Sequence, residues 1–157
     1  MEPSKLKRPS LFAPANMAMP SGSSSYSNSS SPCEAHTAMC VSELMNAATS
    51  FHKIHLKVTG SGSFAAHKAL NELYDALPGH ADDLAEGYQG AAEKLLTYSE
   101  TSPKVLNSVE ESLSYIRELV QMVSALQSVM PYSELVNELD NVKSTLNSAK
   151  YKLKFLS

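Results

Sequence analysis

The 157-residue chain has no tryptophan, only two cysteines, and no histidine after position 80. Cys33 and Cys40 are too few to build a disulfide scaffold, so the fold must rest on its apolar core, and a reducing compartment is the plain interpretation. With 43% apolar residues and this length, the sequence suits a single packed domain.

Long runs of one kind of residue are also missing. The net charge is −3 and only the start, KLKRP, is locally basic, so the chain as a whole lacks the electrostatic footprint of a nucleic-acid binder. No apolar run approaches the roughly 20 residues that a membrane-spanning helix needs. Proline and asparagine interrupt the early apolar residues before they could form a signal peptide. We therefore expect a soluble cytoplasmic protein with no membrane partner.

Residues 1–34 differ in composition from the remainder. They hold five of the eight prolines and the tract SGSSSYSNSSSP, and such a segment cannot bury enough apolar surface to offset the entropy of ordering. This predicts a flexible, disordered Ser/Pro-rich arm over 1–34 and a helical domain over 35–157. The arm is either a linker or a segment that docks to a partner or to DNA through its few basic residues.

From Glu34 onward, apolar residues recur at intervals of three and four, which predicts four helices and no strands. We expect the helices at about 35–58, 63–90, 103–130 and 133–155. Gly60 is placed to end the first helix and Ser63 to cap the second. Pro78 lies inside the second pattern without shifting its phase, so a kink is expected there.

The segments between the predicted helices differ in length. The first and last connections are short, which favours antiparallel hairpins. About 13 residues, AAEKLLTYSETSP, join the second helix to the third, and this is long enough to cross a bundle of about 30 Å. Hairpin, crossover, hairpin is the connectivity of a ferritin-like four-helix bundle, and a simple up-down-up-down bundle remains the alternative.

Two histidines and two carboxylates suggest a metal site. The first predicted turn brings His55 and His67 to the same end of the bundle, where two neutral imidazoles can share one metal. Asp82 and Glu86 are four residues apart on one face of the second helix. About 22 Å of helix separates His67 from Asp82, so a shared site needs an antiparallel two-fold dimer. These mixed ligands suit Fe(II), with Zn(II) or Mn(II) as rivals.

The spacing of these four residues, with Gly60 inside the first gap, resembles the ferroxidase signature of the Dps family, the ferritin-like DNA-binding proteins from starved cells. The resemblance implies that His55 and His67 come from one subunit of a homo-oligomer. Asp82 and Glu86 would come from its two-fold partner, and the assembly could be a dodecameric shell. The function implied is a ferroxidase and iron-storage protein that handles Fe2+ and Fe3+ and oxidises Fe(II) with peroxide or dioxygen.

Two positions depart from the family pattern. Asn71 stands where family members usually carry another acidic ligand, and Leu56 stands where tryptophan is common. The segments HKALNELYDALPGHADDLAEGYQG and YKLKFL also resemble small ferritin-like proteins encoded by tailed bacteriophages. The second hypothesis is therefore a non-catalytic ferritin-like structural or virion-associated binding protein of a bacteriophage, located in the virion. DNA compaction through the basic arm is a third.

The remaining polar residues have ordinary interpretations. Because no histidine follows His80, the third and fourth helices cannot supply the Glu-x-x-His motif of an intrachain di-iron site. We expect His52 and His80 on the surface, His36 in the arm, and Tyr74 in the core or an interface. The glutamates of the last two helices are expected on solvated faces; they are Glu110, Glu111, Glu118, Glu134 and Glu138.

Overall fold

The computed structural model describes residues 31–157, and the expectation of a flexible arm falls mainly on residues 1–30, outside the described part. Residues 31–157 form four helices and no strand. The helices are α1 (Pro32–His55), α2 (Ser63–Ala92), α3 (Val109–Gln127) and α4 (Ser133–Phe155). This confirms the predicted all-α class with four helices. None of these helices is long and apolar enough to cross a membrane.

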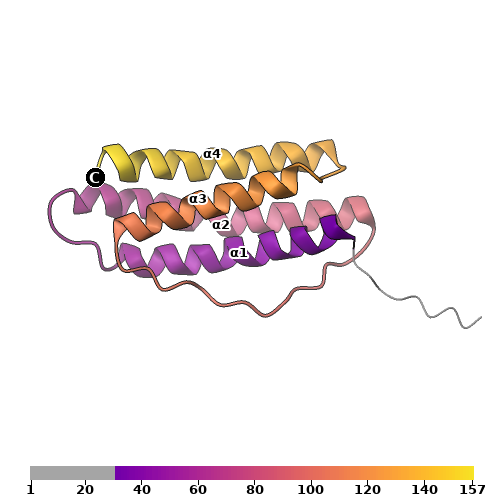
Figure 1. The fold of residues 1–157 in the computed structure, drawn as a ribbon, viewed down its shortest axis with the longest axis horizontal. Helices are drawn as coiled ribbons and strands as arrows, with labels where there is room; N and C mark the ends of the chain where they lie inside the picture. Colours follow the sequence, from indigo (N-terminus) through magenta and orange to yellow (C-terminus); the bar gives the residue numbers. More distant parts are fainter. Residues whose placement is uncertain (1–30) are drawn as a thin grey trace, which may run out of the picture.

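The four helices lie side by side in two hairpins joined by a long segment (Figure 1). α1 and α2 are antiparallel, and residues 93–108 then return along the length of the bundle, so that α3 runs in the same direction as α2. α4 lies antiparallel to α3. α1 packs against α2 and α3, whereas α4 packs against α2 and α3. The order is therefore hairpin, crossover, hairpin, not up-down-up-down.

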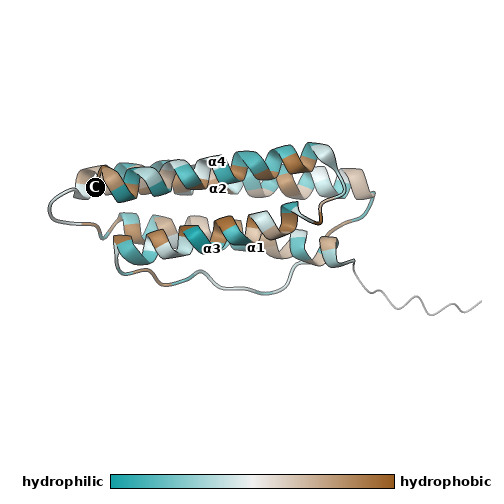
Figure 2. Cartoon of the chain, turned by 45° about the horizontal axis from the view of Figure 1, so that its top comes forward, coloured by the Kyte–Doolittle hydropathy of each residue, from teal (hydrophilic) through white to brown (hydrophobic). Residues whose placement is uncertain are grey.

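One apolar core runs through the bundle, and every helix contributes a stripe of apolar residues to it. Figure 2 shows apolar bands alternating with polar bands on the helices. Phe51, Leu77, Ile116 and Leu139, one from each helix, are wholly buried. Burying a side chain of this size contributes roughly 2 kcal/mol before the entropy cost. The crossover also takes part, because Leu96 and Leu106 are buried, so it is anchored to the helices near both of its ends.

Local capping chemistry shifts the helix boundaries from those expected. α1 begins at Pro32 because Ser31 caps it, its hydroxyl accepting a hydrogen bond from the Glu34 amide at 3.2 Å. The expected start at 35 was therefore wrong, and His36 belongs to α1, where it is exposed. α1 also ends at His55, earlier than the expected 58.

The third helix begins later than Pro103, the predicted start. Ser108 is its N-cap and accepts from the Glu111 amide at 3.1 Å, while the Glu111 carboxylate accepts from the Asn107 amide at 2.8 Å. The Ser108 cap starts the helix at Val109, and Glu111 also holds the backbone of the residue before the cap. The serine and glutamate three residues apart were a better signal than the proline.

The turn between α1 and α2 depends on two glycines with left-handed backbone angles, Gly60 (φ +89°) and Gly62 (φ +76°). Gly62, not Ser63, is the N-cap of α2, and it lies against the backbone of Ser157 at the end of α4. A side chain at this position would collide with that backbone. α2 then runs unbroken through Pro78.

Candidate functional site

Four rings meet where α1 ends and α2 begins, and we call His52, His55, His67 and Tyr74 the histidine cluster. The ring centroids of His55 and His67 are 4.0 Å apart. His52 stacks on Tyr74 with a centroid distance of 4.1 Å, and Tyr74 meets His55 edge-on at 5.1 Å. The structure thus brings together the two histidines selected from the sequence and adds two further rings.

Backbone carbonyls orient the two central imidazoles. His55 Nδ1 lies 3.3 Å from the carbonyl oxygen of His52, and His67 Nδ1 lies 3.2 Å from that of His55. A carbonyl oxygen only accepts hydrogen bonds, so each Nδ1 carries the proton and donates. This tautomer leaves the Nε2 lone pair of both rings for another electrophile, as in histidines that bind metals.

The two rings are packed against each other, with centroids 4.0 Å apart and planes tilted by 30°. A metal ion bound by both rings would need each Nε2 about 2.1 Å from one point. His55 is only 6% exposed, His67 is half-buried and His52 is exposed. The pair therefore lies at the boundary between core and surface, where burial limits the movement of the rings.

Asn71, one turn after His67 in α2, is held by its neighbours. Its amide nitrogen donates to Asp75 Oδ2 at 2.7 Å, and its carbonyl oxygen accepts from the Tyr74 hydroxyl at 3.1 Å. Both polar ends of the amide are thus engaged. Through Tyr74, the same residue is linked to the histidine cluster.

Asp82 and Glu86 lie elsewhere on the same helix. Both side chains are exposed, and neither forms a hydrogen bond or ion pair with residues 31–157. Because α2 is continuous, Asp82 lies about 22 Å along the axis from His67. Nearby is Tyr98 of the crossover, whose pKa is raised by burial and then by the negative charge of Asp82.

In a single chain the histidine pair and the carboxylate pair are therefore far apart. Within the described part, no three His, Cys, Asp or Glu side chains are close enough together to hold a metal ion. The histidine pair and the carboxylate pair are not brought together in one subunit. A site that uses all four residues requires a second copy of the chain, as the helix length alone indicated.

His80, the remaining histidine of the described residues, has a structural role. His80 Nδ1 lies 2.9 Å from Glu138 Oε1, and its Nε2 lies 2.8 Å from Thr145 Oγ1. The ring thereby links α2 to α4, and both His80 and Glu138 are mostly buried. The expectations of a surface histidine and a solvated glutamate were wrong, because the register between α2 and α4 is not visible in either helix alone.

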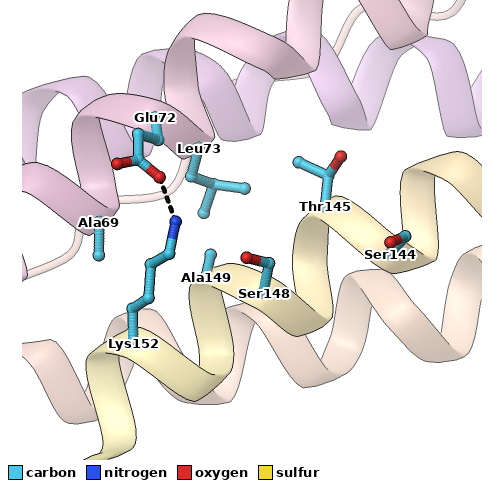
Figure 3. A pocket seen from close by; sticks show the side chains of 8 residues that line it. All are labelled: Ala69, Glu72, Leu73, Ser144, Thr145, Ser148, Ala149 and Lys152. Carbon is cyan, nitrogen blue, oxygen red and sulfur yellow. Dashed lines mark hydrogen bonds and ion pairs between the residues drawn. The ribbon is translucent and has the colours of Figure 1, made fainter. Parts of the chain in front are cut away.

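Another hollow, of about 270 Å³, lies between α2 and α4 (Figure 3). Glu72 and Lys152 form an ion pair at its edge, and the other side chains drawn there are small or apolar. The paired charges neutralise each other, and no histidine or cysteine lines this hollow. It offers no acid–base pair comparable to the histidine cluster.

Sequence reasoning missed Tyr74 and His52 as members of the cluster. Tyr74 is seven residues after His67, or about two helical turns, and His52 is three residues before His55. Both spacings place the extra residues on the same helical faces as the two histidines. A check of these faces could have found the stacked pair.

The fold and the site together define an all-helical bundle with a histidine cluster at one end of its first hairpin. The chain belongs to a family described as a family of unknown function (DUF5856), whose model matches residues 55–153. This match begins at His55 and spans α2, α3 and α4. No curated protein and no solved structure matches the chain.

Proposed function

We propose that the chain is a ferritin-like, Dps-like protein that binds and oxidises Fe(II) at sites shared between two subunits. His55 and His67 of one subunit would be neutral ligands, and Asp82 and Glu86 of its two-fold partner would be anionic ones. Peroxide or dioxygen would accept the electrons. The ferric product would be retained in a hollow homo-oligomer, for which a dodecameric shell is the proposed form.

The observation that carries this proposal is the contact between His55 and His67, with a carbonyl acceptor at each Nδ1. A metal-binding pair needs adjacent rings whose Nε2 lone pairs remain free. The two exposed carboxylates support the second half of the site, because they have no partner among residues 31–157. Imidazole and carboxylate together form a donor set that suits Fe(II).

An antiparallel dimer accounts for the separation of the half-sites along α2. A two-fold axis midway between His67 and Asp82 would place the histidines of each subunit over the carboxylates of the other. Two equivalent sites would result. The order of the helices, with one long crossover between two hairpins, is also that of ferritin-like bundles and supports the assignment.

Mixed oligomers test this arrangement directly. One chain carries His55→Ala and His67→Ala, the other Asp82→Asn and Glu86→Gln, and each alone should oxidise Fe(II) no faster than buffer. After the two are unfolded together and refolded, half of the dimers should be mixed, each with one intact site. We expect about a quarter of the wild-type rate to return. His36→Ala, an exposed histidine of α1, is the matched control and should keep full activity.

Three results would overturn the proposal. The first is a wild-type chain that oxidises Fe(II) no faster than buffer, and the second is an active chain that is monomeric at the assay concentration. The third is the absence of recovery when native mass spectrometry shows that mixed dimers have formed. Circular dichroism should show that every variant remains helical.

Asn71 favours a second function, in which the chain is a non-catalytic, virion-associated ferritin-like protein of a bacteriophage. This amide is engaged by Asp75 and Tyr74, so it adds no anionic ligand to the histidine half-site. Under this second function, wild-type protein forms an oligomer but shows no iron oxidation. Asn71→Asp should then create metal binding by adding the missing carboxylate, whereas Asp75→Asn, the control, should not.

A further inference from the structure

The end of α4 carries a surface that the core and the histidine cluster do not use. Arg117 of α3 and Lys150, Tyr151, Lys154 and Phe155 of α4 line a hollow of about 400 Å³, and we call them the basic–aromatic patch. Tyr151 is 55% exposed and Phe155 is 64% exposed. Large aromatic side chains are normally drawn into a core, so two of them on one open helix face suggest an external partner.

The register of α4 explains why these rings are outside. Its buried side chains, which include Leu146, Ala149 and Leu153, occupy the face turned to the bundle. Tyr151 and Phe155 are one turn apart and fall on the opposite face. The rings are 5.6 Å apart and touch each other, not the core.

The charge of the patch is not compensated within the described part of the chain. Arg117, Lys150 and Lys154 form no ion pair there, and no acidic residue lines the hollow. The other two lysines of α4 behave differently, since Lys143 is paired with Asp140 and Lys152 with Glu72. Three unpaired cations in a chain of net charge −3 form a local surface complementary to an anionic partner.

We propose that the basic–aromatic patch is a docking surface for an anionic lipid bilayer. Phe155 and Tyr151 would enter the headgroup region, while Lys150, Lys154 and Arg117 would lie at the level of the phosphates. Leu156, 54% exposed, adds apolar surface beside them. This inference is independent of the proposed iron chemistry. It departs from the expectation of no membrane partner, because peripheral contact does not need a spanning helix.

The ring geometry disfavours a nucleic-acid base sandwiched between Tyr151 and Phe155. A base held between two rings needs parallel rings about 7 Å apart, twice the usual contact distance, but Tyr151 and Phe155 are tilted by 45° and only 5.6 Å apart. Lys154 also lies over the Phe155 ring at 5.0 Å, so one stacking face is already covered. Entry into a headgroup layer needs no free ring face.

Vesicle flotation with the full chain tests the proposal. We expect binding to equimolar phosphatidylserine and phosphatidylcholine at low salt, weaker binding as salt rises, and little binding to phosphatidylcholine alone. Lys150→Gln with Lys154→Gln should weaken vesicle binding about 30-fold, because both lysines lose their attraction to the anionic surface. Tyr151→Ala with Phe155→Ala should weaken it about tenfold, because less apolar surface is buried.

Matched control variants remove the same groups outside the patch. Lys53→Gln with Lys68→Gln removes two exposed lysines, and Phe64→Ala removes a ring that is 78% exposed. Both controls should bind vesicles like wild type. Equal losses in controls and patch variants would overturn the assignment, and so would the absence of vesicle binding by wild type. Binding to a single-stranded oligonucleotide that needs the patch, without vesicle binding, would assign the surface to nucleic acid instead.

Discussion

The two hairpins of the bundle have the same plan but use their polar residues differently. In the α1–α2 hairpin, His52, His55, His67 and Tyr74 are in ring contact near the turn. In the α3–α4 hairpin, polar side chains cap a helix or cross-link the helices, as Gln127 does by donating to Asp140 at 2.8 Å. The cluster of histidine rings thus belongs to one hairpin.

This difference shows what each hairpin contributes. The first holds the histidine cluster, which the proposed metal chemistry would use, at a partly buried position. The second completes the core and reaches back to the first through the bridge between His80 of α2 and Glu138 of α4. Changes to the histidine cluster should therefore alter the proposed iron chemistry, whereas changes to the side chains that cross-link the helices should alter stability.

The largest expected effect separates two histidines of one helix. His67→Ala should lower the rate of Fe(II) oxidation well over tenfold. Mutating a residue that only hydrogen-bonds to a metal ligand already lowers metal affinity or activity by about tenfold or more. His80→Ala, also in α2 but bridged to α4, should keep the rate and lose stability. Stopped-flow absorbance of ferric product measures both. Equal loss of activity in the two variants would remove the distinction between a ligand and a structural histidine.

Core truncation should affect both hairpins alike. Leu77→Ala in α2 and Leu139→Ala in α4 each leave a cavity at a wholly buried position, and each should lower the free energy of unfolding by about 3 kcal/mol. Val129→Ala, at a position 45% exposed, is the control and should change it by less than about 0.5 kcal/mol. Urea titration measures all three. An unchanged free energy of unfolding in Leu139→Ala would contradict a core shared by both hairpins.

Alkaline pH should destabilise the bundle through Cys40 of α1. Burial, aided by the charge of Glu43, raises the pKa of this thiol from 9.0 to about 12. Above about pH 9 the unfolded chain loses the thiol proton while the folded chain keeps it, so stability falls as pH rises. Between about pH 8 and about pH 10.5 this contributes a loss of about 2 kcal/mol.

The test compares the pH dependence of unfolding in wild type, Cys40→Ala and Cys33→Ala. Cys40→Ala should remove that contribution, whatever its effect at neutral pH. Cys33→Ala, which removes the half-buried thiol of the same helix, serves as the control. Tyr115 of α3, whose pKa is also raised by burial and by its bond to Glu43, should leave part of the alkaline loss in every variant. An unchanged slope in Cys40→Ala would contradict the assignment.

The smallest expected effect concerns the link between the hairpins. A double-mutant cycle of His80→Ala and Glu138→Ala should give a coupling energy of about 1 kcal/mol. This is the usual net contribution of one hydrogen bond to the free energy of unfolding. Glu134→Ala, an exposed glutamate one turn earlier in α4, is the control and should not couple to His80. A coupling near zero would mean that the hairpins are joined by the core alone.

The sequence predicted the number and class of the elements because each helix has its own apolar stripe. Leu135, Leu139, Val142 and Leu146 in α4 are spaced by three and four residues, and all of them are buried. Boundaries were less predictable where competing signals were close together. Pro103 suggested a start that the capping pair Ser108 and Glu111 moved to Val109.

The candidate site was partly visible in the sequence for a similar reason. A short turn forces neighbouring helix ends together, so the approach of His55 to His67 needed no knowledge of the rest of the chain. The stacking of Tyr74 on His52 and the bridge from His80 to Glu138 were not predicted. Both depend on how one helix is rotated and shifted against another.

The amino-acid sequence by itself determined which faces are apolar, where short turns pair helices, and that His67 and Asp82 are too far apart on one helix to share a ligand. These properties follow from helix geometry, which is local. Only the tertiary structure decided that His67 Nδ1 meets the His55 carbonyl oxygen, that His52 stacks on Tyr74, and that His80 reaches Glu138. Such outcomes depend on the relative rotation of packed helices, and no single helix encodes that rotation.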